Sequence, residues 1–172
     1  FDAGETADGR PYLVMEYIQG EPIHRYCDTH RLSTEERLEL FVQVCEGVQH
    51  AHHKGIIHRD LKPSNILVTV RDDRPLPKII DFGLAKATAP GLTGGTMVTE
   101  RGQILGTLEY MSPEQAGATS IDVDSRADIY SLGVVLYELL VGTVPFDRRP
   151  RGSAGLVDVS TWMDGSDPPR PS

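Results

Sequence analysis

The stretch His58-Arg59-Asp60-Leu61-Lys62-Pro63-Ser64-Asn65 decides how this chain of 172 residues is interpreted. It brings a histidine, a carboxylate, two basic side chains and an amide within eight consecutive positions. The triplet Asp81-Phe82-Gly83 follows, and Ser112-Pro113-Glu114 comes after it. Each triplet alone is weak evidence, but the three blocks in this order and at this spacing rarely arise together by chance.

The three blocks resemble the catalytic loop, the metal-binding triplet and the end of the activation segment of a protein kinase. The run G-T-L-E-Y-M-S-P-E-Q-A at residues 106–116 is most similar to bacterial kinases of the eukaryotic type. The resemblance covers about residues 1–146. It implies an α+β, protein kinase-like fold with a mainly helical large lobe, a small β-hairpin and a hinge, and with the small lobe mostly missing.

The resemblance assigns chemical roles to residues of the first two blocks. Phosphoryl transfer depends on positioning and charge neutralisation, so a carboxylate such as Asp60 would orient the substrate hydroxyl and accept its proton. Lys62 would direct its ammonium group at the transferring phosphoryl group, and a lysine here resembles the serine/threonine class. Asn65 and Asp81 would hold Mg²⁺ through hard oxygen ligands. Thr107 would bond to the catalytic Asp and Lys. Taken singly, Asp60 and Asp81 are equally compatible with loop carboxylates that only make turns.

A nucleotide site is implied by a second resemblance near the start of the chain. Residues 15–18 (M-E-Y-I) resemble the hinge that edges the adenine pocket of ATP. Met15 would be the gatekeeper, while the backbones of Glu16 and Ile18 would pair with the purine. Leu67 would form the floor beneath the adenine. The alternative for residues 15–18 is an ordinary strand end, and for Leu67 it is simple core packing.

Regulation is implied by the arginine that precedes the expected catalytic aspartate. By resemblance, Arg59 would pair with a phosphate on the activation segment and so order it. Thr99 is the expected main phosphosite, with Thr96 and Thr93 behind it. Structural roles are implied for a further set: His58, Phe82, Gly83, Glu114 and Asp128. Of these, Asp128 would bond the backbone of the catalytic loop, and Glu114 would pair with an arginine beyond Ser172.

Local patterns predict the secondary structure around these blocks. A strand is expected over residues 10–17, after the turn signal Asp8-Gly9. Ser33 and Glu36 form a capping box that starts a helix, whose buried stripe would run from Leu38 to Ala51 through Phe41, Val44 or Cys45, and Val48. Gly55 would stop this helix. A small hairpin is expected with strands at 66–68 and 78–80 and a turn over 71–77. A nearly apolar helix over about 125–141 should be central and buried.

Composition narrows the class of partner and compartment. A net charge of -8 argues against nucleic acid as the main partner, because phosphate binding needs a basic patch. Two cysteines without a CxxC pair suggest reduced thiols in a cytoplasmic protein, although a parent chain could be membrane-anchored. The most apolar stretch, around 129–144, is too short and polar for a membrane span. Zinc binding by His50, His52 and His53 is a weaker alternative to solvated or packed histidines.

The ends of the chain suggest a partial domain. The chain begins at Phe1 in the middle of a pattern and ends in a proline-rich loop. We therefore expect residues 1–20 to be the end of the small lobe and hinge, and 21–172 a large lobe truncated at its C-terminal end. The expected partners are ATP and protein substrates with Ser or Thr. The competing hypothesis is a non-catalytic, pseudokinase-like binding module.

Overall fold

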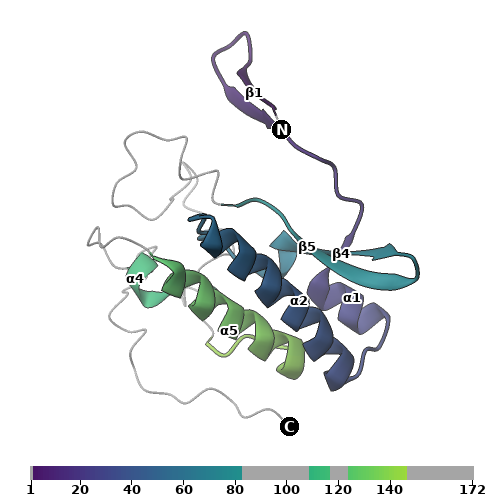
Figure 1. Ribbon diagram of the computed structural model, residues 1–172. Helices are drawn as coiled ribbons and strands as arrows, with labels where there is room; N and C mark the ends of the chain where they lie inside the picture. Colours follow the sequence, from purple (N-terminus) through teal and green to yellow (C-terminus); the bar gives the residue numbers. More distant parts are fainter. Residues whose placement is uncertain (1, 83–108, 117–123, 147–172) are drawn as a thin grey trace, which may run out of the picture.

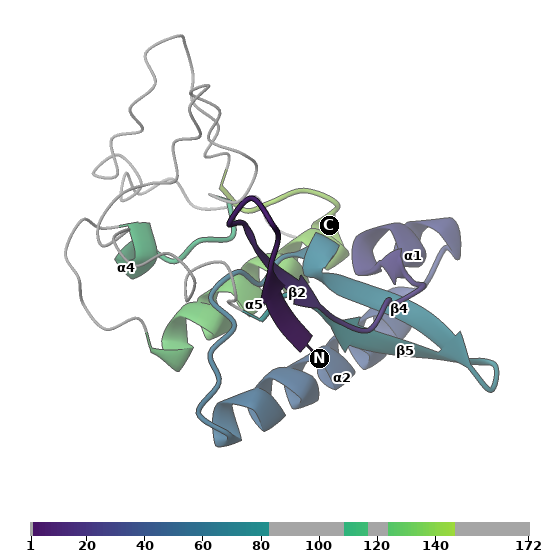
Figure 2. The same cartoon turned by 90° about the horizontal axis from the view of Figure 1, so that it is seen from above.

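The computed structural model describes residues 2–82, 109–116 and 124–146, and the statements below concern these residues. Its main body consists of two long helices, α2 (Thr34–His53) and α5 (Ser125–Val141), that pack beside each other, with α2 also against a small sheet (Figure 1). A separate two-stranded hairpin carries the N-terminal end (Figures 1 and 2). The expected α+β architecture, mainly helical with a small antiparallel sheet, is confirmed.

Helix α2 (Thr34–His53) begins at the expected capping box. Glu36 Oε2 accepts from the Ser33 amide at 2.7 Å, and Ser33 Oγ accepts from the Glu36 amide at 3.3 Å. The helix ends before Gly55, whose φ of 74° favours glycine. Both predicted ends are thus confirmed. The predicted stripe is wrong at Leu38, which is 40% exposed, while Leu40 on the inner face is buried. The buried apolar residues of α2 are Leu40, Phe41, Val44, Val48 and Ala51.

The hairpin that follows the segment His58–Asn65 is longer than predicted, and its turn is tighter. Strands β4 (Ile66–Arg71) and β5 (Arg74–Ile79) are joined only by Asp72 and Asp73, with φ values of 50° and 58°. Two successive positive φ values are typical of a two-residue hairpin turn. The prediction of a turn over 71–77 is wrong because Pro75 and Pro77 lie within β5. This strand is at the edge of the sheet, where proline is tolerated.

The N-terminal region contains two elements that the sequence did not predict, strand β3 (Glu21–Pro22) and helix α1 (Ile23–Thr29). Strands β1 (Asp2–Glu5) and β2 (Pro11–Val14) pair with each other, so the expected strand over 10–17 ends at Val14. Strand β3 (Glu21–Pro22) then pairs with β4, and helix α1 (Ile23–Thr29) follows directly. The pairing of β3 with β4 thus holds the chain that leads from the N-terminal hairpin to the main body against β4.

Helix α5 (Ser125–Val141) has the predicted bounds, with Asp124 as its N-cap and Gly142 at its end. It is not buried all round, since Ile129 is 60% exposed. Its inner face joins α1, α2 and β4 in one core. The buried members of this core are Ile23, Tyr26, Cys27, Leu40, Phe41, Val44, Ile66, Val68, Val135 and Leu139. A short helix, α4 (Pro113–Ala116), lies near the start of α5 (Figure 2).

Arg37 ties three of these elements together at the end of the core. Its guanidinium donates to Leu139 O at 2.9 Å in the last turn of α5 and to Asp28 Oδ1 at 2.8 Å in α1. Cations near a helix C-terminus are favourable because the last carbonyl groups lack partners. Arg37 therefore fixes the end of α5 against α1 and α2.

Cys27 and Cys45 are both unpaired, as predicted, and burial raises the pKa of each thiol. Among the described helices, none combines the length and apolar content that a membrane span requires.

Candidate active site

The segment His58–Asn65 connects α2 to β4 and ends in the short 3₁₀ helix η1 (Pro63–Asn65). Asp60 lies at its centre and is partly exposed. Lys62 Nζ donates to Asp60 Oδ2 at 2.8 Å, and Asn65 Nδ2 donates to the same oxygen at 3.2 Å and to Asp60 O at 2.9 Å. The structure therefore brings together three residues that the sequence singled out, with one carboxylate oxygen held by an ammonium and an amide.

The antiparallel pairing of β4 and β5 brings Asn65 and Asp81 to the same end of the hairpin. Ile66 pairs with Ile79, and the Ile80 amide donates to Asn65 O at 2.9 Å. Asp81 follows directly, is exposed and has a φ of 60°. Because Asn65 Nδ2 is engaged by Asp60, its amide oxygen is the atom available to a cation. An amide oxygen and an exposed carboxylate at the same end of a hairpin form a donor set of the type that suits Mg²⁺.

His58 is fully buried and connects the segment to the end of β5. Its Nε2 donates to Ile80 O at 2.9 Å, so the neutral ring accepts at Nδ1 from the Asp60 amide at 3.2 Å. Its ring contacts the Phe82 ring, with centroids 4.7 Å apart. Burial lowers the pKa of His58, which favours this neutral form. Its position thus couples the backbone of Asp60 to the residues that precede Asp81.

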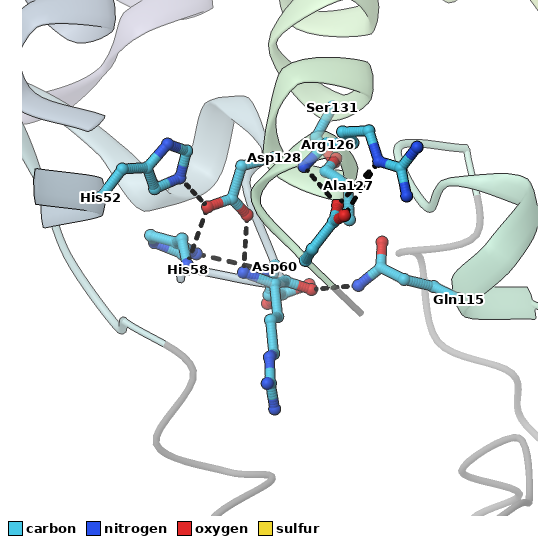
Figure 3. Close-up of polar contacts among 10 residues, drawn as sticks. His52, His58, Asp60, Gln115, Arg126, Ala127, Asp128 and Ser131 are labelled. Carbon is cyan, nitrogen blue, oxygen red and sulfur yellow. Dashed lines mark hydrogen bonds and ion pairs between the residues drawn. The ribbon is translucent and has the colours of Figure 1, made fainter. Parts of the chain in front are cut away.

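Asp128 in α5 holds the same segment from the other side (Figure 3). Its Oδ2 accepts from the His58 amide at 2.8 Å, and its Oδ1 accepts from the Arg59 amide at 2.8 Å. His52 Nε2 adds a third contact to Oδ2, at 2.7 Å. A carboxyl group with 1% exposure requires such donors, because burial removes its water. Sequence reasoning missed this role of His52, and no local pattern signals a partner 76 positions away.

A further contact reaches the segment from α4. Gln115 Nε2 donates to Arg59 O at 2.9 Å (Figure 3). Just before α4, Tyr110 is tied to α5, because Ser131 Oγ donates to Tyr110 O at 2.7 Å and the Tyr110 hydroxyl donates to Glu138. Burial raises the pKa of Tyr110, and the hydrogen bond to Glu138 raises this pKa further. Gln115 was also missed as a site residue, although its offset from Ser112 (S-x-x-Q) is the signal of a capping box.

The expected nucleotide-binding positions lie in the chain that follows β2 and, for Leu67, within β4. Met15 and Glu16 are exposed, and Lys78 Nζ lies 3.3 Å from Glu16 Oε1. Ile18 and Leu67 are half-buried. Gly20 lies so close to β4 that an added Cβ would be 3.1 Å from Leu67 Cβ. The chain after residues 15–18 therefore packs directly on the residue expected to be the adenine floor.

Several expected site residues lie outside the described residues. These are Gly83, Thr93, Thr96, Thr99 and Thr107. Glu114 is described, is exposed, and forms no ion pair with any residue in the described ranges. The described residues contain no group of three or more His, Cys, Asp or Glu side chains that could hold a metal ion. For His52, the contact with Asp128 favours packing over zinc.

Comparison with known proteins gives a consistent result. Residues 4–163 match the family model described as "Protein kinase domain". The chain is 43% identical to the serine/threonine-protein kinase Pkn1 of Myxococcus xanthus, over 100% of this chain and 23% of that protein. It is 39% identical to pkn3 of the same organism, over 99% of this chain and 30% of the relative. It is 41% identical to PknB of Mycobacterium tuberculosis, over 85% of this chain and 23% of that protein. The chain thus spans less than a third of the length of these relatives.

Proposed function

The chain belongs to the protein kinase domain family, as a bacterial, eukaryotic-type serine/threonine kinase, and we propose that it forms part of a longer enzyme. Residues 1–20 would be the end of its small lobe and the hinge, and residues 21–172 a partial large lobe. This enzyme transfers the γ-phosphoryl group of ATP to Ser or Thr hydroxyls of proteins, in the cytoplasm. The observation that carries the proposal is the arrangement of Lys62 and Asn65 around one oxygen of Asp60.

That arrangement divides the work of the two oxygens of Asp60. Oδ2 is held by Lys62 and Asn65, whereas Oδ1 has no partner among the described residues. Oδ1 accepts a hydrogen bond from the substrate hydroxyl, and then its proton as the new O–P bond forms and ADP leaves. Lys62 lies close enough to Asp60 to offset negative charge where it develops. The partly exposed position of Asp60 keeps it within reach of a protein substrate.

Asn65 and Asp81 are the residues that would hold Mg²⁺. When bound, the ion neutralises phosphate charge and orients the nucleotide. The adenine is expected to lie on Leu67 and to pair with the backbones of Glu16 and Ile18, with Met15 as gatekeeper. The His58 contacts with Ile80 and Asp60 keep the base and the ion-binding end of the hairpin in a constant relative position.

Regulation is proposed to act through Arg59. A phosphate on Thr99, or on Thr96 or Thr93, would pair with its guanidinium by charge-assisted hydrogen bonds. Thr107 is proposed to contact Asp60 and Lys62 when the segment is ordered. Phosphopeptide mapping of active enzyme tests this assignment, and stoichiometric phosphate elsewhere with Thr99 bare contradicts it.

The segment of 172 residues alone is expected to have little or no activity. The glycine-rich loop and the nucleotide-anchoring lysine of the family are not among these residues, and losing one preorganised electrostatic contact typically costs a hundred- to a thousand-fold in rate. A phosphate-transfer assay with Mg-ATP and a basic protein substrate tests this expectation. A robust signal that Asp60→Asn abolishes would refute it.

The function itself is tested by two matched substitutions in the full kinase chain that contains these residues. Asp60→Asn should lower kcat on the order of 10²–10⁴-fold and leave ATP affinity within a few fold, because Asp60 acts on the hydroxyl. Asp81→Asn should weaken Mg-ATP binding as well as turnover. Near-normal turnover of Asp60→Asn refutes the role of the base. A wild-type chain that binds partner proteins without any phosphate transfer would favour the non-catalytic alternative.

A further inference from the structure

Gln115 connects the end of the activation segment to the peptide that precedes the proposed base. Its side-chain oxygen, Oε1, accepts from the Ser112 amide and from Ser112 Oγ, both at 3.2 Å. Its side-chain nitrogen, Nε2, donates to Arg59 O at 2.9 Å. One amide group therefore bridges two segments that lie 56 positions apart in the sequence.

The orientation of this amide is determined by its partners. Oε1 faces an N–H and a hydroxyl, while Nε2 faces a carbonyl oxygen. Turning the amide by half a rotation would place an oxygen against Arg59 O and an NH₂ group against the Ser112 amide, so that both of these bonds would be lost. Ser112 is fully buried, so the anchored end of this bridge is itself fixed.

The bridge ends on a strained residue. Arg59 has a φ of 67°, which is unfavourable for a residue other than glycine and persists only where the surrounding contacts compensate for the strain. Asp128 Oδ1 holds the Arg59 amide on one side of this residue. Gln115 holds its carbonyl oxygen on the other side. Together these contacts fix the backbone N–H and C=O groups of the residue directly before Asp60.

We propose that Gln115 is a positioning residue for phosphoryl transfer. Its hydrogen bond to Arg59 O couples the position of the Ser112–Gln115 turn to the backbone conformation of Asp60. This inference rests on the proposed function and adds a regulatory link to it. When the turn is in the position described, Nε2 donates to Arg59 O and the carboxylate of Asp60 keeps one orientation. When the turn is displaced, Arg59 O loses its donor and the strain is released.

The competing explanation is that Gln115 only caps α4. Ser at the N-cap with Gln at the third helical position forms a capping box, and Glu serves equally well there. Gln115→Glu therefore keeps the cap and the shape of the side chain, removes the donor to Arg59 O and adds a negative charge. Gln115→Met removes the donor and the cap together, without adding charge, so only a loss shared by both variants is attributed to the donor. Gln49→Glu, at an exposed position on α2, is the matched control for an added negative charge.

The experiment measures kcat, the KM for ATP and amide hydrogen exchange in the full kinase chain. For Gln115→Glu and Gln115→Met we expect kcat to fall about tenfold with the KM for ATP within twofold, since a lost hydrogen bond of this kind has that size. The amides of Arg59 and Asp60 should exchange several times faster. Amides in the middle of α2 should exchange at the wild-type rate, which verifies that the variants are folded.

Three results would overturn the inference. The first is unchanged kcat and unchanged exchange in both variants. The second is a loss confined to Gln115→Glu, which would attribute the effect to its charge. The third is an equal loss in Gln49→Glu. A wild-type chain without phosphate transfer would contradict the proposed function instead, and exchange at Arg59 and Asp60 would then decide the role of Gln115 alone.

Discussion

Replacing Asp128 by Asn removes one hydrogen-bond acceptor from the buried side chain that holds the segment His58–Asn65. The carboxyl group accepts three hydrogen bonds, two at Oδ2 and one at Oδ1. An Asn side chain keeps one oxygen, and its NH₂ group then faces an N–H group of the His58–Arg59 backbone or the His52 ring. A hydrogen bond to a charged group is worth about 1.5–3 kcal/mol, and an unsatisfied buried donor costs about 1–3 kcal/mol. The expected loss in the free energy of unfolding is about 3 kcal/mol, a large part of the roughly 5–15 kcal/mol of a typical domain.

Urea unfolding of the kinase domain that contains these residues, followed by circular dichroism, measures this loss. With a slope of about 1–3 kcal/mol per molar urea, the midpoint should fall by about 1–3 M. Asp124→Asn is the matched control, because this half-exposed N-cap accepts from the Arg126 amide and Asn caps a helix as well as Asp does. Its midpoint should stay within about 0.3 M of wild type. Equal midpoints for the two variants would refute the account of Asp128.

Three further outcomes follow from other contacts. Ser33→Ala removes the N-cap of α2 and should lower the free energy of unfolding by about 1 kcal/mol in the same urea assay, with no change contradicting the capping box. Burial lowers the pKa of His58, so as the pH falls the imidazole is protonated in the unfolded chain before it is protonated in the folded one. The free energy of unfolding should therefore decrease below about pH 6.5. For His58→Phe, this decrease between pH 8 and 5 should be shallower. Gly20→Ala, whose Cβ would meet a β4 carbonyl oxygen at 3.0 Å, should destabilise the domain by about 1–3 kcal/mol and raise the KM for ATP. Gly133→Ala, with open space around it, should instead stabilise α5 by about 0.5–1 kcal/mol. A change in stability of the same sign for both variants would contradict this reasoning.

The parts of the fold that depend on neighbouring residues could be predicted from the sequence. The bounds of α2 and α5 follow from caps and glycines that act within one turn. Strand β3 and helix α1 could not be predicted in this way. Strand β3 has two residues and exists because it pairs with β4, and α1 follows directly from Pro22 without a side-chain cap. The apolar content of α5 also overstated its burial, because composition does not tell which neighbours cover each face.

In the candidate site too, local motifs could be predicted from the sequence, whereas contacts from distant residues could not. Asp60, Lys62 and Asn65 lie within six positions, so a local motif is sufficient to identify them together. The contacts that hold this motif come from far away in the sequence, from His52 and Gln115 among others. A histidine near the end of a helix and a glutamine after a proline-glutamate pair have many possible roles, and only the packing of α2, α4 and α5 around one peptide distinguishes between them.

The contacts of Asp128 with the catalytic segment also have an evolutionary consequence. Both bonds go to main-chain amides, which every residue other than proline possesses. The side chain of Arg59 takes no part in this anchoring. A relative with another residue here would keep the proposed base anchored to α5, whatever becomes of the proposed pairing of Arg59 with a phosphorylated threonine. The mode of activation would then be free to drift while the chemistry stayed the same, and proline is the one substitution at this position that the anchor would forbid.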